Sequence, residues 1–273
     1  MLSQPVVLRR PRAAQSFAVA AVIGVLGGLI GLGGAEFRLP YLIGVLGLSA
    51  HQAVPVNLAI SLATLLAATP ARAAALSPGL LAPFAVEAAG MTLGAVAAAY
   101  LGAGWVRRLS GRRLSEVILV LLLCLGVALI VEVLVEGGGR ALVPDGVAAR
   151  ALAGLALGVG IGLISSLLGV AGGEVIIPAL VFGFAAPIKV AGSLSLLISL
   201  PTVLVGVARH ARAGALRDGV ILRGMVAPMA LGSMAGAVVG GLLVGLVPAD
   251  LLKLGLGVLL IWSAWKAFRH VRA

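Results

Sequence analysis

The sequence has little of what a soluble or disulfide-stabilised protein needs. Charged residues make up 11% of the 273 residues and aromatic residues only 4%, whereas soluble domains are about 25% charged. The single cysteine, Cys124, lies in an apolar run, which excludes an intrachain disulfide and a cysteine-based metal cluster. Because 61% of the residues are apolar and the mean hydropathy is +1.19, the composition excludes a soluble globular protein.

Motifs for catalysis and nucleotide binding are missing as well. The sequence contains no G-x-S-x-G, no H-E-x-x-H and no P-loop. An intramembrane enzyme therefore stays an alternative without a motif to support it, and ATP-driven transport is disfavoured. We expect a protein that is not an enzyme and that holds neither a metal ion nor a cofactor.

What the sequence does contain is a series of long apolar runs. They fall at about 16–34, 37–47, 52–70, 80–104, 114–135, 151–170, 175–186, 188–208, 219–246 and 250–268. Runs of about 20 residues have the length of membrane-spanning helices, so the sequence predicts an all-α polytopic membrane protein. The net charge of +11 comes from short clusters between the runs. Such clusters are typical of cytoplasmic loops and do not favour a nucleic-acid partner.

The two halves of the chain repeat each other at a constant spacing. LGGAEFRLP at 32–40 and VAGGEVIIP at 170–178 place Glu36 and Glu174 in register, 138 residues apart. Further matches of Pro, Met, Ser and Thr keep the same register, which composition alone does not explain. We therefore predict a single membrane domain of three parts. These are a first membrane repeat over 1–136, an external linker over 137–150 and a second membrane repeat over 151–273.

The placement of charge predicts opposite orientations for the two repeats. Run 37–47 is too short to cross a hydrocarbon core of about 30 Å, so we interpret 16–34 and 37–47 as a helical hairpin broken at its glycines. Three transmembrane helices follow the hairpin in each repeat. Thirteen cations then lie in cytoplasmic segments, whereas the outer loops hold only four, Arg72 and Arg150 among them. Because three crossings are an odd number, the repeats are inverted, and both termini are predicted to be cytoplasmic.

Inverted repeats with discontinuous helices are typical of transporters, whose site lies where the two breaks meet. The motifs GLGGA (31–35) and GVAGG (169–173) predict these breaks. A half-helix that starts there offers free backbone N–H groups to an anion. The candidate substrate-binding positions at the breaks are Gly33, Gly34, Ala35, Gly172 and Gly173. The alternative is that these small residues serve close helix packing only.

An acidic residue follows the glycines directly in each half. Glu36 and Glu174 are therefore predicted to lie within the membrane, where a carboxylate is costly and burial favours its protonated form. Both are candidates for substrate binding and for proton coupling. The alternative is that each carboxylate only caps the start of its half-helix.

A polar stripe runs along one helix face in each half, at the spacing i, i+4 and i+7. Its members are Asn57, Ser61 and Thr64 in the first half and Ser195, Ser199 and Thr202 in the second. We expect both faces to point into the bundle. Asn57, Ser61, Ser195 and Ser199 are predicted to contact substrate, with Thr64 and Thr202 as further candidates. Alternatively, the groups bond back to their own helix or to a neighbouring helix.

Arg38 breaks the symmetry, because its counterpart in the second half is Ile176. We include Arg38 as a further site candidate that pairs with a carboxylate across the interface between the repeats. The alternative is a side chain that snorkels outward from the bundle.

The quoted motifs resemble one family of membrane proteins. The resemblance is to the TauE/SafE family of permeases, and it is carried by GLGGAEFRLP followed by HQAVPVNLAISL and by GVAGGEVIIP followed by IKVAGSLSLLISLPTVLVGVARH. In this chain, Ala35 and Ala171 replace glycines of the family signature. The resemblance implies a multi-pass carrier in a bacterial plasma (inner) membrane. Its cargo would be sulfite or another small organosulfur or organic anion.

The leading hypothesis is therefore a secondary transporter that moves a small anion, with protons as the coupling ion. A passive anion channel is the alternative, and it would not need the paired glutamates. The expected partners are the anion, protons and the lipid bilayer. A homodimer is a further expectation, from the small-residue face GSMAGAVVGG at 232–241; the alternative is that this face makes internal contacts.

Overall fold

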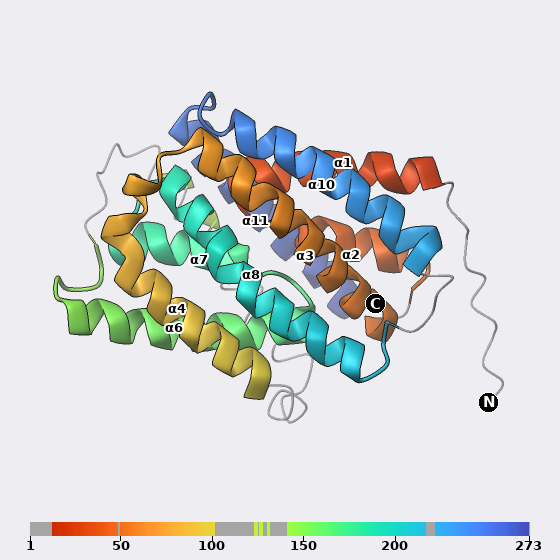
Figure 1. Ribbon diagram of the computed structural model, residues 1–273, viewed down its shortest axis with the longest axis horizontal. Helices are drawn as coiled ribbons and strands as arrows, with labels where there is room; N and C mark the ends of the chain where they lie inside the picture. The colour runs from red at the N-terminus through yellow and green to blue at the C-terminus, as the bar shows by residue number, and fades with distance from the viewer. Residues whose placement is uncertain are drawn as a thin grey trace.

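The computed structural model describes residues 13–48, 50–101, 123, 124, 126, 127, 130, 131, 141–216 and 222–272, and its regular elements there are all helical (Figure 1). The described α-helices are α1 (Ala13–Ile30), α2 (Ala35–Gly44), α3 (Ala50–Ala75), α4 (Ala85–Leu101), α6 (Val147–Leu168), α7 (Gly173–Pro178), α8 (Ile188–Arg212), α10 (Ala227–Leu243) and α11 (Ala249–Arg272). Short turns of other helix types are η1 (Pro78–Leu80), η2 (Ala82–Phe84), η4 (Ala179–Gly183) and η5 (Leu222–Val226). The predicted all-α class is confirmed.

Six helical segments of the described chain are long and apolar enough to cross a membrane. They are Ala13–Ile30, Gln52–Ala75, Ala82–Tyr100, Val147–Ser166, Ile188–Arg212 and Gly224–Leu243. Helices α2 and α7 are shorter, as the sequence predicts for the second arm of each hairpin. The predicted run 114–135 lies mostly outside the described residues.

The helical hairpins are broken at the glycines that the sequence indicates. Between α1 and α2 the backbone of Gly33 and Gly34 has φ of 77° and 72°, and between α6 and α7 that of Gly172 has φ of 82°. Positive φ is readily adopted by glycine and strained for residues with a Cβ, so these positions end one helix and allow the next to start in another direction. The predicted break in each half is confirmed.

Glycines also bring helices of different repeats into close contact. Helix α1 of the first half packs along α10 of the second half, and α4 packs along α6 in the same way (Figure 1). A Cβ on Gly232, Gly236 or Gly240 would overlap the backbone of α1. The face at 232–241 therefore makes internal contacts, which was the alternative interpretation, and it does not support a homodimer.

The same packing yields a matched pair of stability predictions on α6. A Cβ on Gly158 would overlap the carbonyl oxygen of Met91, whereas a Cβ on Gly160 would meet no atom within 4 Å. Gly158→Ala should therefore destabilise the protein by about 1–3 kcal/mol, whereas Gly160→Ala should be neutral or slightly stabilising. Thermal unfolding in detergent measures both variants. Equal midpoints for the two would contradict the close approach of α4 and α6.

The two long helices that carry the polar stripes, α3 and α8, contact each other and run antiparallel. Leu58 near the start of α3 lies beside Gly206 near the end of α8, and Arg72 near the end of α3 lies beside Gly192 near the start of α8. These helices occupy equivalent positions in the sequence repeat. Their opposite directions are what an inverted repeat requires.

Two cations that the charge count assigned to outer loops lie in helices instead. Arg72 is 1% exposed within α3, because this helix continues to Ala75, beyond the end of its apolar run. Arg150 lies in the first turn of α6, where its Nη2 donates to Glu87 Oε1 at 2.5 Å. Glu87 is buried, and an ion pair formed there leaves no uncompensated charge. Hydropathy and charge counts along the chain could not show that Arg72 and Glu87 are buried.

Candidate functional site

The two helix breaks lie against each other in the middle of the bundle. A Cβ placed on Gly33 would be 3.7 Å from the Cβ of Ala171, and a Cβ on Gly173 would be 3.0 Å from the Cα of Leu32. The space between these residues, about 140 positions apart in the chain, is thus no larger than a methyl group. The two breaks therefore lie next to each other in the folded protein.

One side chain ties the two breaks together. The Nδ2 atom of Asn57, on α3, donates to the carbonyl oxygen of Ala35 at 2.9 Å and to that of Gly169 at 3.1 Å. The first oxygen belongs to the start of α2 and the second to the break before α7. Asn57 is completely buried, so these bonds are shielded from competition with water.

Arg38 bonds to the same asparagine and is also completely buried. Among the groups that the structure describes, its guanidinium donates to at least five neutral oxygens. They are Asn57 Oδ1 (3.3 Å), Thr64 Oγ1 (3.2 Å), Ser233 Oγ (2.7 Å), the Gly33 carbonyl oxygen (2.9 Å) and Ser61 Oγ (2.7 Å). The alternative of an outward-snorkelling Arg38 is therefore wrong. Arg38 joins the first break to α3 and to α10.

The polar stripe of the first half thus surrounds Arg38. Asn57, Ser61 and Thr64 are all buried, as expected of a face that points into the bundle. Ser61 Oγ donates to the Asn57 carbonyl oxygen and Thr64 Oγ1 to that of Ile60, each at 2.8 Å. The hydroxyl groups of Ser61 and Thr64 thus donate to their own helix and accept hydrogen bonds from Arg38.

The second half is built differently around the same positions. Ile176 takes the place of Arg38 and lies in an apolar cluster. Ser199 Oγ donates to the Ala171 carbonyl oxygen at 2.8 Å, and Thr202 Oγ1 donates to that of Ile198 at 3.0 Å. Within the described part of the chain, Ser195 Oγ is buried without a hydrogen-bond partner. It lies 3.0 Å from the position of a Cβ on Gly173.

Of the two glutamates, the structure describes one side chain. Glu174 lies in the first turn of α7 and is 6% exposed, directly after the second break. The backbone of Glu36 belongs to α2, but its side chain lies outside the described residues. The prediction that an acid beside the break is buried therefore holds for Glu174.

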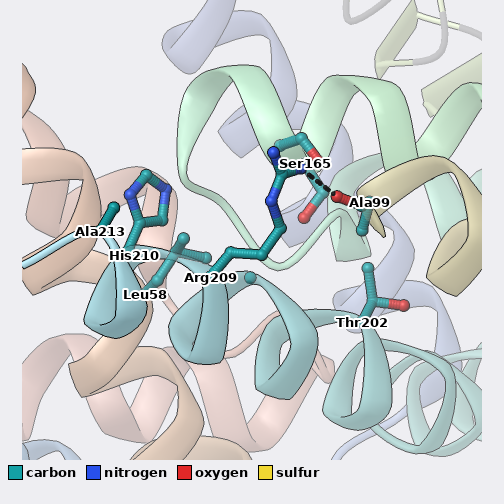
Figure 2. A pocket seen from close by; sticks show the side chains of 9 residues that line it. Leu58, Ala99, Ser165, Thr202, Arg209, His210 and Ala213 are labelled. Atoms are coloured by element: carbon teal, nitrogen blue, oxygen red, sulfur yellow. Dashed lines mark hydrogen bonds between the residues drawn. The ribbon is translucent and has the colours of Figure 1, made fainter. Parts of the chain in front are cut away.

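Two cavities that are lined by described residues lie at opposite ends of the contact between α3 and α8. The larger, of about 230 Å³, is lined by Leu58, Ala99, Ser165, Ser166, Thr202, Gly206, Arg209, His210 and Ala213 (Figure 2). The smaller, of about 80 Å³, is lined by Thr69, Arg72, Ala73, Leu76, Leu81, Ser193, Leu196 and Leu197. Among the predicted site residues, Thr202 lines the larger cavity, whereas the glycines of the breaks, Asn57 and Ser195 line neither.

The repeat relates the two cavities, and this relation explains their difference in size. At an offset of 138 residues, Arg72 corresponds to His210 and Leu196 to Leu58. The Arg72 guanidinium extends to the end of α1, where Nη1 donates to the carbonyl oxygens of Gly28 (2.9 Å) and Leu29 (2.8 Å). The shorter His210 leaves the equivalent space open. An alignment of the two halves pairs Arg72 with His210, whereas the charge count along the chain places Arg72 in a loop.

A comparison with known families identifies the protein family of this chain. The model of the sulfite exporter TauE/SafE family matches residues 2–129 and 154–273, which together make up nearly the whole chain. The chain belongs to the sulfite exporter TauE/SafE family. Neither a curated protein nor a solved structure matches it significantly.

Membership in the TauE/SafE family establishes the class of function. The protein is a multi-pass membrane transporter for a small anion and not an enzyme. The resemblance inferred from the glycine-rich motifs is confirmed. The interval between the two matched ranges contains the predicted linker at 137–150.

Proposed function

We propose that this TauE/SafE protein is a secondary carrier that moves sulfite or another small organosulfur anion through the contact between its two helix breaks. The observation that carries the proposal is the meeting of Gly33 with Ala171 and of Gly173 with Leu32, at the crossing of α3 and α8. Inverted-repeat carriers bind substrate at such breaks. The gap between the breaks is no larger than a methyl group, so an anion can occupy this layer only when they separate.

Chemical groups suited to an anion converge on this layer. The backbone N–H groups at Gly34 and Ala35 start α2, and those at Gly172 and Gly173 start α7, where the helix dipole favours negative charge. Ser195 Oγ adds a buried hydroxyl that bonds to no described group. We assign substrate contact to these groups and to Ser199, whose bond to Ala171 holds the second break.

The two breaks are held with unequal strength. Arg38 anchors the first break through five hydrogen bonds, whereas Ile176 occupies the equivalent place beside the second break. We infer that the second break and α7 move while the first stays fixed. Opening on one side and closing on the other then agrees with cavities of about 230 Å³ and 80 Å³. A continuous pore would instead require both sides to be open together, which favours a carrier over a channel.

We assign proton coupling to Glu36 and Glu174. Glu174 is buried beside the second break, a place in a membrane protein where an ionisable side chain points to a functional role. A protonated glutamate donates a hydrogen bond to an anion, whereas an ionised one repels it. Loss of the proton would therefore release the anion.

Flux measurements in proteoliposomes test the carrier proposal. Purified protein is reconstituted, and uptake of labelled sulfite, sulfate, taurine and acetate is measured with and without an imposed pH gradient. A carrier accumulates its anion above the external concentration when the gradient is present. Flux that only equilibrates the anion would identify a channel, and an absence of flux for every anion would overturn the proposed substrate class.

The proposed membrane is the bacterial inner membrane, with both termini in the cytoplasm. Figure 1 places the start of α1 and the end of α11 toward the same end of the bundle. Leu142, in the external linker, is 79% exposed, and Ala213 lies at the end of α8 on the cytoplasmic side. In a Cys124→Ser background, an impermeant thiol reagent added to whole cells should label Leu142→Cys and not Ala213→Cys. The reverse pattern would contradict this orientation.

A further inference from the structure

We propose that the larger cavity is an anion-capture site, which holds a small sulfonate- or sulfite-like anion on the cytoplasmic side before it reaches the breaks. The inference rests on the proposed function for its role in transport, but the site itself is argued from the cavity. Arg209 is its main ligand, and His210 and Ser166 supply further donors. Figure 2 shows Arg209 and His210 projecting from α8 on the side of the cavity where Ser165 lies.

The Arg209 side chain is held in place and still has donors to offer. Its Nη1 donates to the carbonyl oxygens of Ala99 (2.9 Å) and Tyr100 (3.1 Å), at the end of α4. Within the described chain its hydrogen bonds use Nη1 only, so Nη2 and Nε remain for a ligand. A positioned guanidinium with two N–H groups on one edge suits the oxygens of a sulfonate.

The other lining groups match an anion in charge and size. None of the described lining residues is acidic, and His210 stands beside Arg209 on the same helix. Ser165 Oγ donates to the Val170 carbonyl oxygen, and Thr202 Oγ1 to that of Ile198, so these two hydroxyls are already committed as donors. Ser166 is the remaining hydroxyl. A volume of about 230 Å³ holds a small anion with several waters, since each water takes up about 30 Å³.

The cavity also lies next to the second break. Ser165, on its wall, bonds to Val170 within that break, and Leu58, on its floor, follows Asn57, which bonds to Gly169. The cavity that Arg209 lines is therefore bounded on one side by residues that are bonded to the second break or adjacent to its partners. At the other end the Arg72 side chain extends into the equivalent space and leaves a cavity of only about 80 Å³, so we place capture on the side of Arg209.

Thiol chemistry tests the site without requiring transport. Ala213→Cys, in the Cys124→Ser background, places a thiol on the rim of the cavity. In detergent, its rate with the anionic reagent methanethiosulfonate-ethylsulfonate is compared with its rate with the cationic methanethiosulfonate-ethyltrimethylammonium. Arg209→Gln should lower this anion-to-cation rate ratio about tenfold, because a charge close to the thiol acts in a medium of reduced dielectric. The matched control Arg212→Gln removes an exposed cation from the same helix and should change the ratio less than Arg209→Gln does, because water and salt screen an exposed charge.

Competition distinguishes a binding site from a positive potential alone. Millimolar ethanesulfonate should slow the reaction saturably with Arg209 in place, and Arg209→Gln should abolish that protection. Arg209→Lys keeps the charge and controls for misfolding of the Arg209→Gln variant. Its anion-to-cation rate ratio should lie between those of the wild type and Arg209→Gln. Equal effects of the Arg209 and Arg212 variants, or no protection by ethanesulfonate, would overturn the site. A chain that shows protection but no flux would overturn the carrier proposal alone.

Discussion

Replacing Arg38 with methionine should lower the midpoint of thermal unfolding by about 10 °C and abolish anion transport. The substitution removes the donor of five hydrogen bonds and leaves Asn57, Ser61, Ser233 and the Gly33 carbonyl oxygen buried with one partner fewer. Removing one member of a buried charged network costs about 3–5 kcal/mol, and each kcal/mol corresponds to about 2–4 °C in a chain of about 150–250 residues. Fluorescence-detected thermal unfolding in detergent measures the midpoint.

Two variants make the Arg38 result specific. Arg38→Lys keeps the charge but has three donors in place of five, so its midpoint should fall between those of the wild type and Arg38→Met. Arg212→Met removes an exposed cation and should leave the midpoint unchanged within about 1 °C. A wild-type midpoint for Arg38→Met would contradict the anchoring of the first break by this side chain.

Glu36→Gln and Glu174→Gln should each retain anion exchange and lose the response to an imposed pH gradient. Glutamine resembles the protonated acid in shape and still donates a hydrogen bond, so an anion can bind. It cannot release a proton, so binding and proton movement become independent. Alanine at either position should also weaken binding, because the donor itself is lost. Counterflow and gradient-driven uptake in proteoliposomes measure exchange and coupling separately.

Glu87→Gln is the matched control for these variants. Glu87 is completely buried, but it pairs with Arg150 between α4 and α6, far along the chain from either break. Its substitution should lower stability and leave the pH response of the surviving protein intact. If both Gln variants still drove uphill flux at wild-type rates, the carboxylates would serve only as helix caps.

The sequence alone determined the class of the protein, its repeat and the places where its helices break. These follow from local physics: apolar runs set the helices, and the glycines of GLGGA and GVAGG permit positive φ. The polar stripe was also readable, because a helix places residues at i, i+4 and i+7 on one face. A buried face follows from that spacing when the flanking residues are apolar.

Only the tertiary structure decided what the polar residues touch. Arg38 and Ser233 are 195 residues apart in the chain, yet they bond at 2.7 Å, and no local pattern encodes such a pairing. Arg72 looked like a loop cation because hydropathy ends before its helix does, and its burial depends on carbonyl oxygens that α1 supplies. The open cavity at His210 likewise depends on how α4, α6 and α8 meet. Contacts between distant segments set these features, because a side chain's partners are fixed by packing and not by its neighbours in sequence.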